Sequence, residues 1–401
     1  MKNTINYKIY DICLKAYCIA SLLTFICLPL KLNSAIALLV RVNFLLWLIL
    51  AAYYVLTAIK TGASRTAVIY LALLLLTAIS LILTGLNRKN IAALLSFLSV
   101  PTILVTGSKL ADLKSVKRFI CVIYFLISLV FIALSFTHYR NIGYDDWGVY
   151  YGAVTLGYAN PNETAMYLLF CILILVYTRL SSTKFFSKRL LELDILYLCY
   201  LLLETECRAV LVSLVFVLVS YFIVKKPGIR KSLVFLSMCI PVIYILLALF
   251  SGSIHNMTFM GEDLFNTRDE MYREIFSQSD LFDLLLGDYA EYHFQNEHNG
   301  YMSILATAGI FGLVSYVTLT YKALTKNIRE HKTSAELWAL CGVLGIIVFS
   351  STEAALLVSG SVYANGIGFL SVLMRHDLPE EQQNGILCEH DGETAGISSA
   401  S

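Results

Sequence analysis

The chain has 401 residues, of which 58% are hydrophobic and only 14% are charged, and its mean hydropathy is +0.72. Because soluble globular proteins carry about 25% charged residues, this composition leaves too little polar surface to cover a water-soluble particle of 44.9 kDa. It excludes a disordered chain, a collagen, a disulfide scaffold and a nucleic-acid-binding protein, and it predicts an integral membrane protein with a net charge of +2.

Apolar runs of about the length that crosses a bilayer as a helix, roughly 20 residues, recur twelve times along the chain. They cover residues 11–30, 36–57, 66–84, 91–107, 119–137, 164–178, 193–204, 208–224, 233–251, 299–321, 336–352 and 355–374. We therefore predict an all-α, polytopic integral membrane protein with about 12 transmembrane helices, which form a single membrane domain over residues 1–375.

The placement of Lys and Arg predicts the orientation of these spans. Loops rich in Lys and Arg alternate with loops that are poor in them, and cytoplasmic loops carry the excess in membrane proteins. Both termini are therefore predicted to be cytoplasmic, and two longer loops, at about 138–163 and 252–298, to face outward. Residues 376–401 are polar and acidic, so we expect a disordered cytoplasmic tail.

Motifs for metals and nucleotides are missing from the sequence. The ten cysteines lie mostly in apolar runs, without CxxC or Cys/His spacing, so we interpret them as packing residues and predict no metal site. The cytoplasmic loops contain no GxxxxGK and no DxD. We therefore predict no cofactor and no use of ATP or a nucleotide sugar, and we expect the chemistry at the outward loops.

Two outward segments begin predicted helices. Residues 160–163 read Asn-Pro-Asn-Glu, which is typical of a helix start. This role is compatible with a second one, in which Asn162 faces a polar cavity. Residues 204–208 read Glu-Thr-Glu-Cys-Arg between two apolar runs. This turn is either a local ion pair or a place where Arg208 binds a phosphate through its two-pronged guanidinium.

A third outward segment, residues 266–274, has the pattern of a short amphipathic helix. Arg268 and Arg273 are the only cations in an otherwise acidic loop. They belong either to a solvated helix with pairs such as Asp269–Arg273 or to a site that recognises an anion.

A fourth segment, residues 296–301, directly precedes the apolar run at 299–321. A helix start favours anions, and His298 is a candidate proton acceptor there, with Glu297 as a weaker one. Asn299 is either a plain helix cap or a ligand contact.

Aromatic residues crowd both outward loops. Tyr144, Trp147 and Tyr158 lie in the first loop, and Tyr272 and Tyr289 in the second. Such rings form an interfacial belt in many membrane proteins. The alternative is that some of them, Tyr272 included, stack on the apolar faces of sugar rings.

The order of these features resembles the bacterial O-antigen ligase and O-antigen polymerase superfamily. An Asn-Pro-Asn segment opens one span, and Arg208 opens a later one. Arg-Asp-Glu-Met-Tyr at 268–272 and Leu-Leu-Leu-Gly-Asp at 284–288 follow, and then His-Asn-Gly-Tyr-Met at 298–302. The motifs span roughly residues 150–320, and each is short.

The resemblance implies a metal-independent, inverting glycosyltransferase of the bacterial inner membrane with a periplasmic active site. Its donor would be a glycan on undecaprenyl pyrophosphate, and a ligase would transfer it to a sugar hydroxyl of lipid A–core. By this resemblance Arg208 and Arg268 would hold the pyrophosphate, and His298 would deprotonate or orient the acceptor hydroxyl. The further predicted substrate contacts are Arg273, Asn162, Asn299 and Tyr272.

Two alternatives to the ligase stay open. The loop between residues 252 and 297 is short and acidic, whereas ligases often carry a longer and more basic one, and this favours a polymerase that joins lipid-linked repeat units. A lipid-linked glycan flippase is the second alternative, although transporters usually show internal repeats and charges at mid-membrane depth. Membrane lipids are the other expected partners, and the sequence does not predict an oligomeric state.

Overall fold

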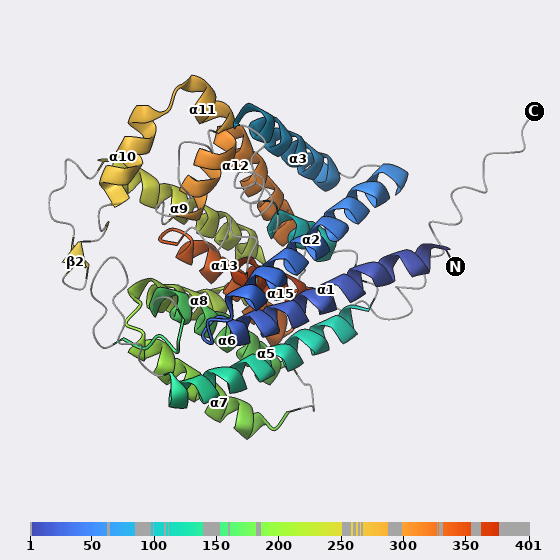
Figure 1. The fold of residues 1–401 in the computed structure, drawn as a ribbon, viewed down its shortest axis with the longest axis vertical. Helices are drawn as coiled ribbons and strands as arrows, with labels where there is room; N and C mark the ends of the chain where they lie inside the picture. The colour runs from blue at the N-terminus through green and yellow to red at the C-terminus, as the bar shows by residue number, and fades with distance from the viewer. Residues whose placement is uncertain are drawn as a thin grey trace, which may run out of the picture.

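The computed structural model of the chain describes most of the predicted membrane domain and almost nothing of the predicted tail. The described residues are 2–61, 65–84, 98, 100–107, 110, 112–138, 153–158, 161–181, 186–250, 258–259, 262–263, 265, 268–287, 299–326, 328, 332–353 and 362–376. Within them the chain is helical apart from a small hairpin, which confirms the predicted all-α class (Figure 1).

The helices follow one another along the chain. They are α1 Lys2–Cys27, α2 Asn33–Thr61, α3 Arg65–Thr84, α5 Leu113–Thr137, α6 Pro161–Leu180, α7 Lys188–Glu204, α8 Arg208–Ile223, α9 Arg230–Phe250, α10 Arg268–Gln278, α11 Leu281–Leu286, α12 Gly300–Lys326, α13 Ser334–Phe349 and α15 Val362–Leu373, with a 3-10 turn at Pro227–Ile229. Strands β1 Thr258–Phe259 and β2 Glu262–Asp263 pair in antiparallel register.

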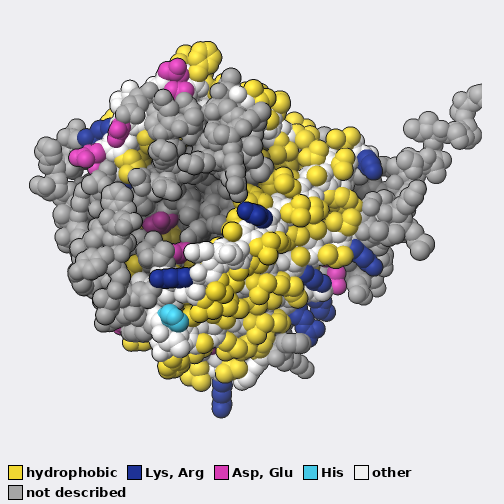
Figure 2. Space-filling view, viewed as in Figure 1, with side chains coloured by type: hydrophobic (Ala, Val, Ile, Leu, Met, Phe, Trp, Pro, Cys, Tyr) yellow, Lys and Arg dark blue, Asp and Glu magenta, His cyan; other side chains and the backbone are white. Residues whose placement is uncertain are grey.

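Where the structure describes the predicted apolar runs, they are helical apart from a few residues at their ends. Among the described residues, five segments are long and apolar enough to cross a bilayer, at Lys8–Cys27, Asn33–Lys60, Leu113–Thr137, Pro161–Leu180 and Pro227–Phe250. The shorter apolar helices lie at Arg65–Ile79, Arg208–Ile223 and Ser334–Phe349. Apolar side chains cover much of the visible helical surface (Figure 2). The chain is therefore a helical membrane protein, and the number of twelve spans stays a prediction.

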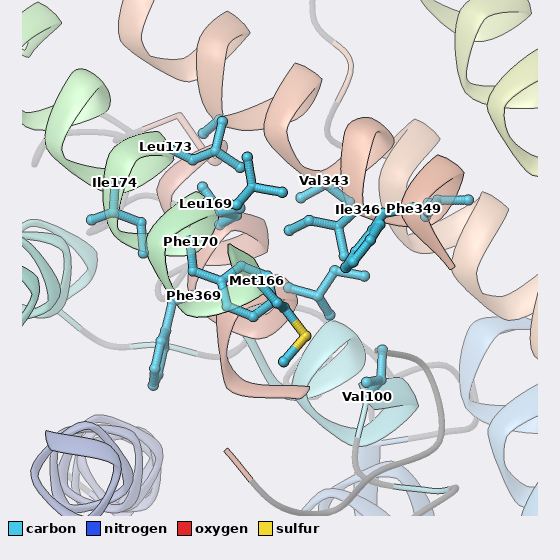
Figure 3. Packing of buried hydrophobic residues seen from close by; sticks show 14 of the residues in the cluster. Val100, Met166, Leu169, Phe170, Leu173, Ile174, Val343, Ile346, Phe349 and Phe369 are labelled. Atoms are coloured by element: carbon cyan, nitrogen blue, oxygen red, sulfur yellow. The ribbon is translucent and has the colours of Figure 1, made fainter. Parts of the chain in front are cut away.

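Helices α6 and α13 form the centre of the bundle. Both are buried on nearly all sides, which is the pattern of helices surrounded by other helices. The side chains of α6 and α13 meet in one apolar cluster (Figure 3). The indole Nε1 of Trp338 on α13 donates to the carbonyl of Leu173 on α6 at 2.9 Å. The two helices are therefore fixed against each other in register.

Small residues bring further helices close to this pair. A Cβ at Gly345 of α13 would lie 2.2 Å from Val217 of α8, and the hydroxyl of Ser213 donates to the Gly345 carbonyl at 2.6 Å. A Cβ at Gly366 of α15 would lie 2.3 Å from the ring of Phe170 on α6. These contacts require glycine and set α8 and α15 directly against the central helices.

A polar cluster closes the end of the bundle where α13 begins. Glu336, buried in the first turn of α13, lies 3.6 Å from the ammonium of Lys117 and 3.2 Å from Nδ1 of His376. Lys117 also donates to the carbonyl of Arg375. The sequence assigns His376 to the tail, but its ring contacts α13, and residues 377–401 lie outside the described residues.

Candidate functional site

The turn at residues 350–353, which follows the last residue of α13, joins several of the predicted outward segments. The amides of residues 350–352 donate back to carbonyls of α13, and the hydroxyls of Ser350 and Thr352 donate to the carbonyls of Ile347 and Phe349. Because the last carbonyls of a helix have no donor within the helix, the carbonyls of the turn are open to other segments.

Three consecutive carbonyls of this turn accept hydrogen bonds from two different helix starts. The amide of Gly300 donates to Ser350 at 2.7 Å, and the side chain of Asn299 donates to Ser351 at 2.8 Å. The guanidinium Nη2 of Arg268 donates to Thr352 at 3.3 Å. The turn therefore brings the starts of α10 and α12 to the end of α13.

Asn299 is a helix cap. It is fully buried, and its side-chain oxygen accepts from the amides of Tyr301 and Met302 at 2.9 and 3.0 Å. Together with the bond to the Ser351 carbonyl, these bonds give the Asn299 side chain a structural role that requires no ligand. The predicted capping role is confirmed, and the predicted contact with a ligand stays untested.

The position of Arg268 follows from the pattern of α10. Arg268, Tyr272 and Ile275 recur at helical spacing on one face, and Tyr272 and Ile275 are buried in the core. Just before the helix, the buried ring of Phe265 packs on Tyr244 of α9, with ring centroids 5.6 Å apart. Arg268 therefore points inward, toward the 350–353 turn, and its Nε is buried without a hydrogen-bond acceptor among the described residues.

Arg273 lies off that face. Its side chain is 42% exposed and forms an ion pair with Asp269 at 2.9 Å. Arg273 therefore belongs to the solvated face of α10, as the first of the two interpretations of this segment predicts. Tyr272, by contrast, is fully buried in the core cluster and presents a packing contact in this structure.

Glu353 is the residue that sequence reasoning missed. The side-chain amide of Asn162, in the first turn of α6, lies 3.5 Å from its carboxylate. Desolvation raises the pKa of the Glu353 carboxyl to about 7, although the nearby positive charge of Arg268 acts in the opposite direction. A carboxyl with this pKa changes its charge near neutral pH, which suits proton transfer.

The start of α8 belongs to the same neighbourhood. The pKa of the Cys207 thiol is raised to about 11, mainly by burial, and the charges of Glu353 and Arg268 both act on it. Cys207 therefore lies near both groups, and Arg208 is the next residue and the first of α8. Arg208 is half-buried and already interacts within the protein.

The structure thus brings Asn162, Arg268, Asn299 and the start of α8 at Cys207 and Arg208 together around the 350–353 turn. It adds Glu353, which lies in this turn. Figure 2 shows acidic side chains in a recess of the visible face. His298 and Glu297 lie outside the described residues, so their predicted roles are not tested. The sequence held one signal for Glu353, because it is an acidic residue between two apolar runs, at 336–352 and 355–374.

The first outward loop is described only in part. Within residues 153–158, Tyr158 is buried and donates its hydroxyl to the carbonyl of Phe25 at 3.0 Å. This ring is therefore a core residue and presents no open face to a sugar. Tyr144, Trp147 and Tyr289 lie outside the described residues.

No protein-family model, curated protein or solved structure matches this chain. Among the described residues, no group of three His, Cys, Asp or Glu side chains is placed to hold a metal ion. The function is therefore argued from the residues around the 350–353 turn.

Proposed function

We propose that this chain is a glycosyltransferase of the O-antigen ligase and polymerase superfamily, and that it acts as the ligase. It would move a glycan from undecaprenyl pyrophosphate to a sugar hydroxyl of lipid A–core on the periplasmic face of the bacterial inner membrane. The observation that carries the proposal is the convergence of Arg268, Asn162 and the start of α8 on the turn that holds Glu353.

Arg268 has the features of a group that binds the donor pyrophosphate. Its Nη2 is held by the Thr352 carbonyl, which fixes the guanidinium plane, while its buried Nε has no acceptor among the described residues. Buried donors are nearly always satisfied, and a phosphate oxygen would satisfy this one with a charge-assisted bond. Arg208 would add a second positive charge at the start of α8.

The transfer needs a base for the acceptor hydroxyl. In the proposed step, the hydroxyl proton goes to this base while the hydroxyl oxygen forms a bond to the anomeric carbon. The bond from that carbon to the pyrophosphate oxygen breaks, and the electron pair leaves with the pyrophosphate, whose charge Arg268 and Arg208 stabilise. His298 is the base implied by the family resemblance, and Glu353 is a second candidate because its pKa of about 7 suits the task.

The polymerase is the second candidate function. It uses the same donor chemistry, with a second lipid-linked repeat unit as the acceptor. The acidic character of the second outward loop favours it, since this loop includes Asp269, Glu270 and Glu274 of α10, the N-cap Asp280 of α11 and Asp283 of α11. A deletion strain separates the two functions: long lipid-linked glycan accumulates without a ligase, whereas core with a single repeat unit accumulates without a polymerase.

Complementation of that strain with Arg268→Ala tests the shared chemistry. We expect a loss of about 10²–10³-fold in transfer, as for removal of one group that stabilises developing negative charge, with His298→Ala defective as well. Arg179→Ala is the matched control, because Arg179 sits in an exposed ion pair with Glu192 at 2.6 Å. Normal surface glycan in Arg268→Ala and His298→Ala, at normal protein levels, would refute the proposal.

A further inference from the structure

Helix α11 presents two large apolar side chains at the edge of the molecule. Leu281 is 69% exposed and Phe282 is 71% exposed. A capping box holds the start of this helix: the side chain of Asp280 accepts from the amide of Asp283, and the Asp283 side chain accepts from the amide of Asp280, both at 2.9 Å. The two apolar side chains therefore project from an ordered turn.

The depth of α11 follows from its contact with α12. Gly309 of α12 has φ +63°, and a Cβ there would lie 2.2 Å from the carbonyl of Leu285, so the two backbones touch. Gly309 interrupts α12 with non-helical backbone, and the helical segment before it, residues 300–308, rises about 13 Å. The sequence predicts a span at residues 299–321. Helix α11 thus contacts the predicted span at its interior break and not beyond its end.

The surface around α11 is apolar as well. On α12, Ile310, Phe311 and Val314 follow the contact point and are exposed, and α3, which also contacts α11, exposes Leu75 and Ile82. Figure 1 shows α11 at the periphery next to α3 and α12, away from the centre of the bundle. The apolar side chains of α11 therefore continue the surface that the neighbouring apolar helices turn outward.

We propose that α11 is embedded in the outer leaflet, with Leu281 and Phe282 between the lipid acyl chains and the capping carboxylates at the headgroup level. Short amphipathic helices bind membranes in this way, with the apolar face a few ångströms below the headgroups. The second outward loop would then be anchored to the bilayer on one side of the site. This inference concerns membrane contact and does not depend on the proposed donor.

The membrane contact of α11 is tested by the fluorescence of a Phe282→Trp variant of the full-length protein. The variant is reconstituted in vesicles of phosphatidylethanolamine and phosphatidylglycerol, and the fluorescence of the wild-type protein is subtracted. We expect the added indole to be quenched by lipids brominated high on the acyl chain and to be shielded from aqueous iodide. Ser277→Trp, at an exposed polar position of α10, is the matched control and should show the reverse. Quenching of position 282 by iodide would overturn the proposal, and so would protection from both quenchers, which would indicate a protein partner or a second copy of the chain.

Because Phe282 is exposed, its replacement by another aromatic residue should leave the fold intact. Thermal unfolding and glycan transfer of the variant are measured alongside the fluorescence. Failure of the transfer assay in wild-type protein together with lipid quenching at position 282 would count against the proposed function and not against the membrane contact.

Discussion

Replacement of Glu353 by Gln should stabilise the protein above neutral pH while reducing its activity. Desolvation raises the pKa of the Glu353 carboxyl from an ordinary 4.5 to about 7. The folded state therefore holds this proton more tightly than the unfolded state does. The stability contributed by the protonated carboxyl is fully present below pH 4.5 and is lost as the pH rises through 7.

The size of the effect follows from the same two pKa values. At 1.36 kcal/mol for each pH unit between them, the wild-type protein loses about 3 kcal/mol by pH 8. Gln is neutral at every pH, has nearly the same shape and does not suffer this loss. For a chain of this length we expect the Tm of Glu353→Gln to exceed that of the wild type by roughly 3 °C at pH 8.

Thermal unfolding of the purified proteins in detergent, at half-unit steps from pH 5 to pH 8.5, measures this difference. The two Tm values should agree at about pH 5 and separate as the pH rises. Parallel Tm curves across the whole range would show that the carboxyl is not desolvated in the folded protein. If Glu353 is also the base, glycan transfer by the variant falls about 10²-fold or more. Wild-type activity should then decline below pH 7, whereas the residual activity of Glu353→Gln should not.

Further predictions concern the buried polar cluster and the kink of α12. Glu336→Ala removes the capping box with Thr333 and leaves Lys117 without its buried carboxylate, so we expect a loss of about 3–5 kcal/mol of stability. Removal of the exposed Arg179–Glu192 pair should cost at most about 1 kcal/mol, and equal Tm losses would contradict the difference in burial. Gly309→Ala places a Cβ 2.2 Å from the Leu285 carbonyl at a φ of +63°. It should lower the Tm and increase proteolysis between α10 and α12, whereas Gly228→Ala, where a Cβ would meet nothing within 4 Å, should not.

The sequence determined the class of the protein because hydropathy is a local property. The apolar runs predicted helices that the structure confirms in the parts it describes, since a chain in lipid must satisfy its backbone hydrogen bonds within each segment. Local patterns also predicted the capping role of Asn299 and the Asp269–Arg273 pair. These features depend on neighbours within a few residues, and a single sequence contains all the information that they require.

Only the tertiary structure could show which outward residues meet. Asn162 and Glu353 are 191 positions apart, and Arg268 is 84 positions from Thr352. Their meeting depends on how α6, α10 and α13 pack, and that packing depends on side-chain fit, such as Trp338 against Leu173. Hydropathy marks Glu353 only as an acidic residue between two apolar runs, whereas its raised pKa comes from burial in the folded protein, which the sequence does not show.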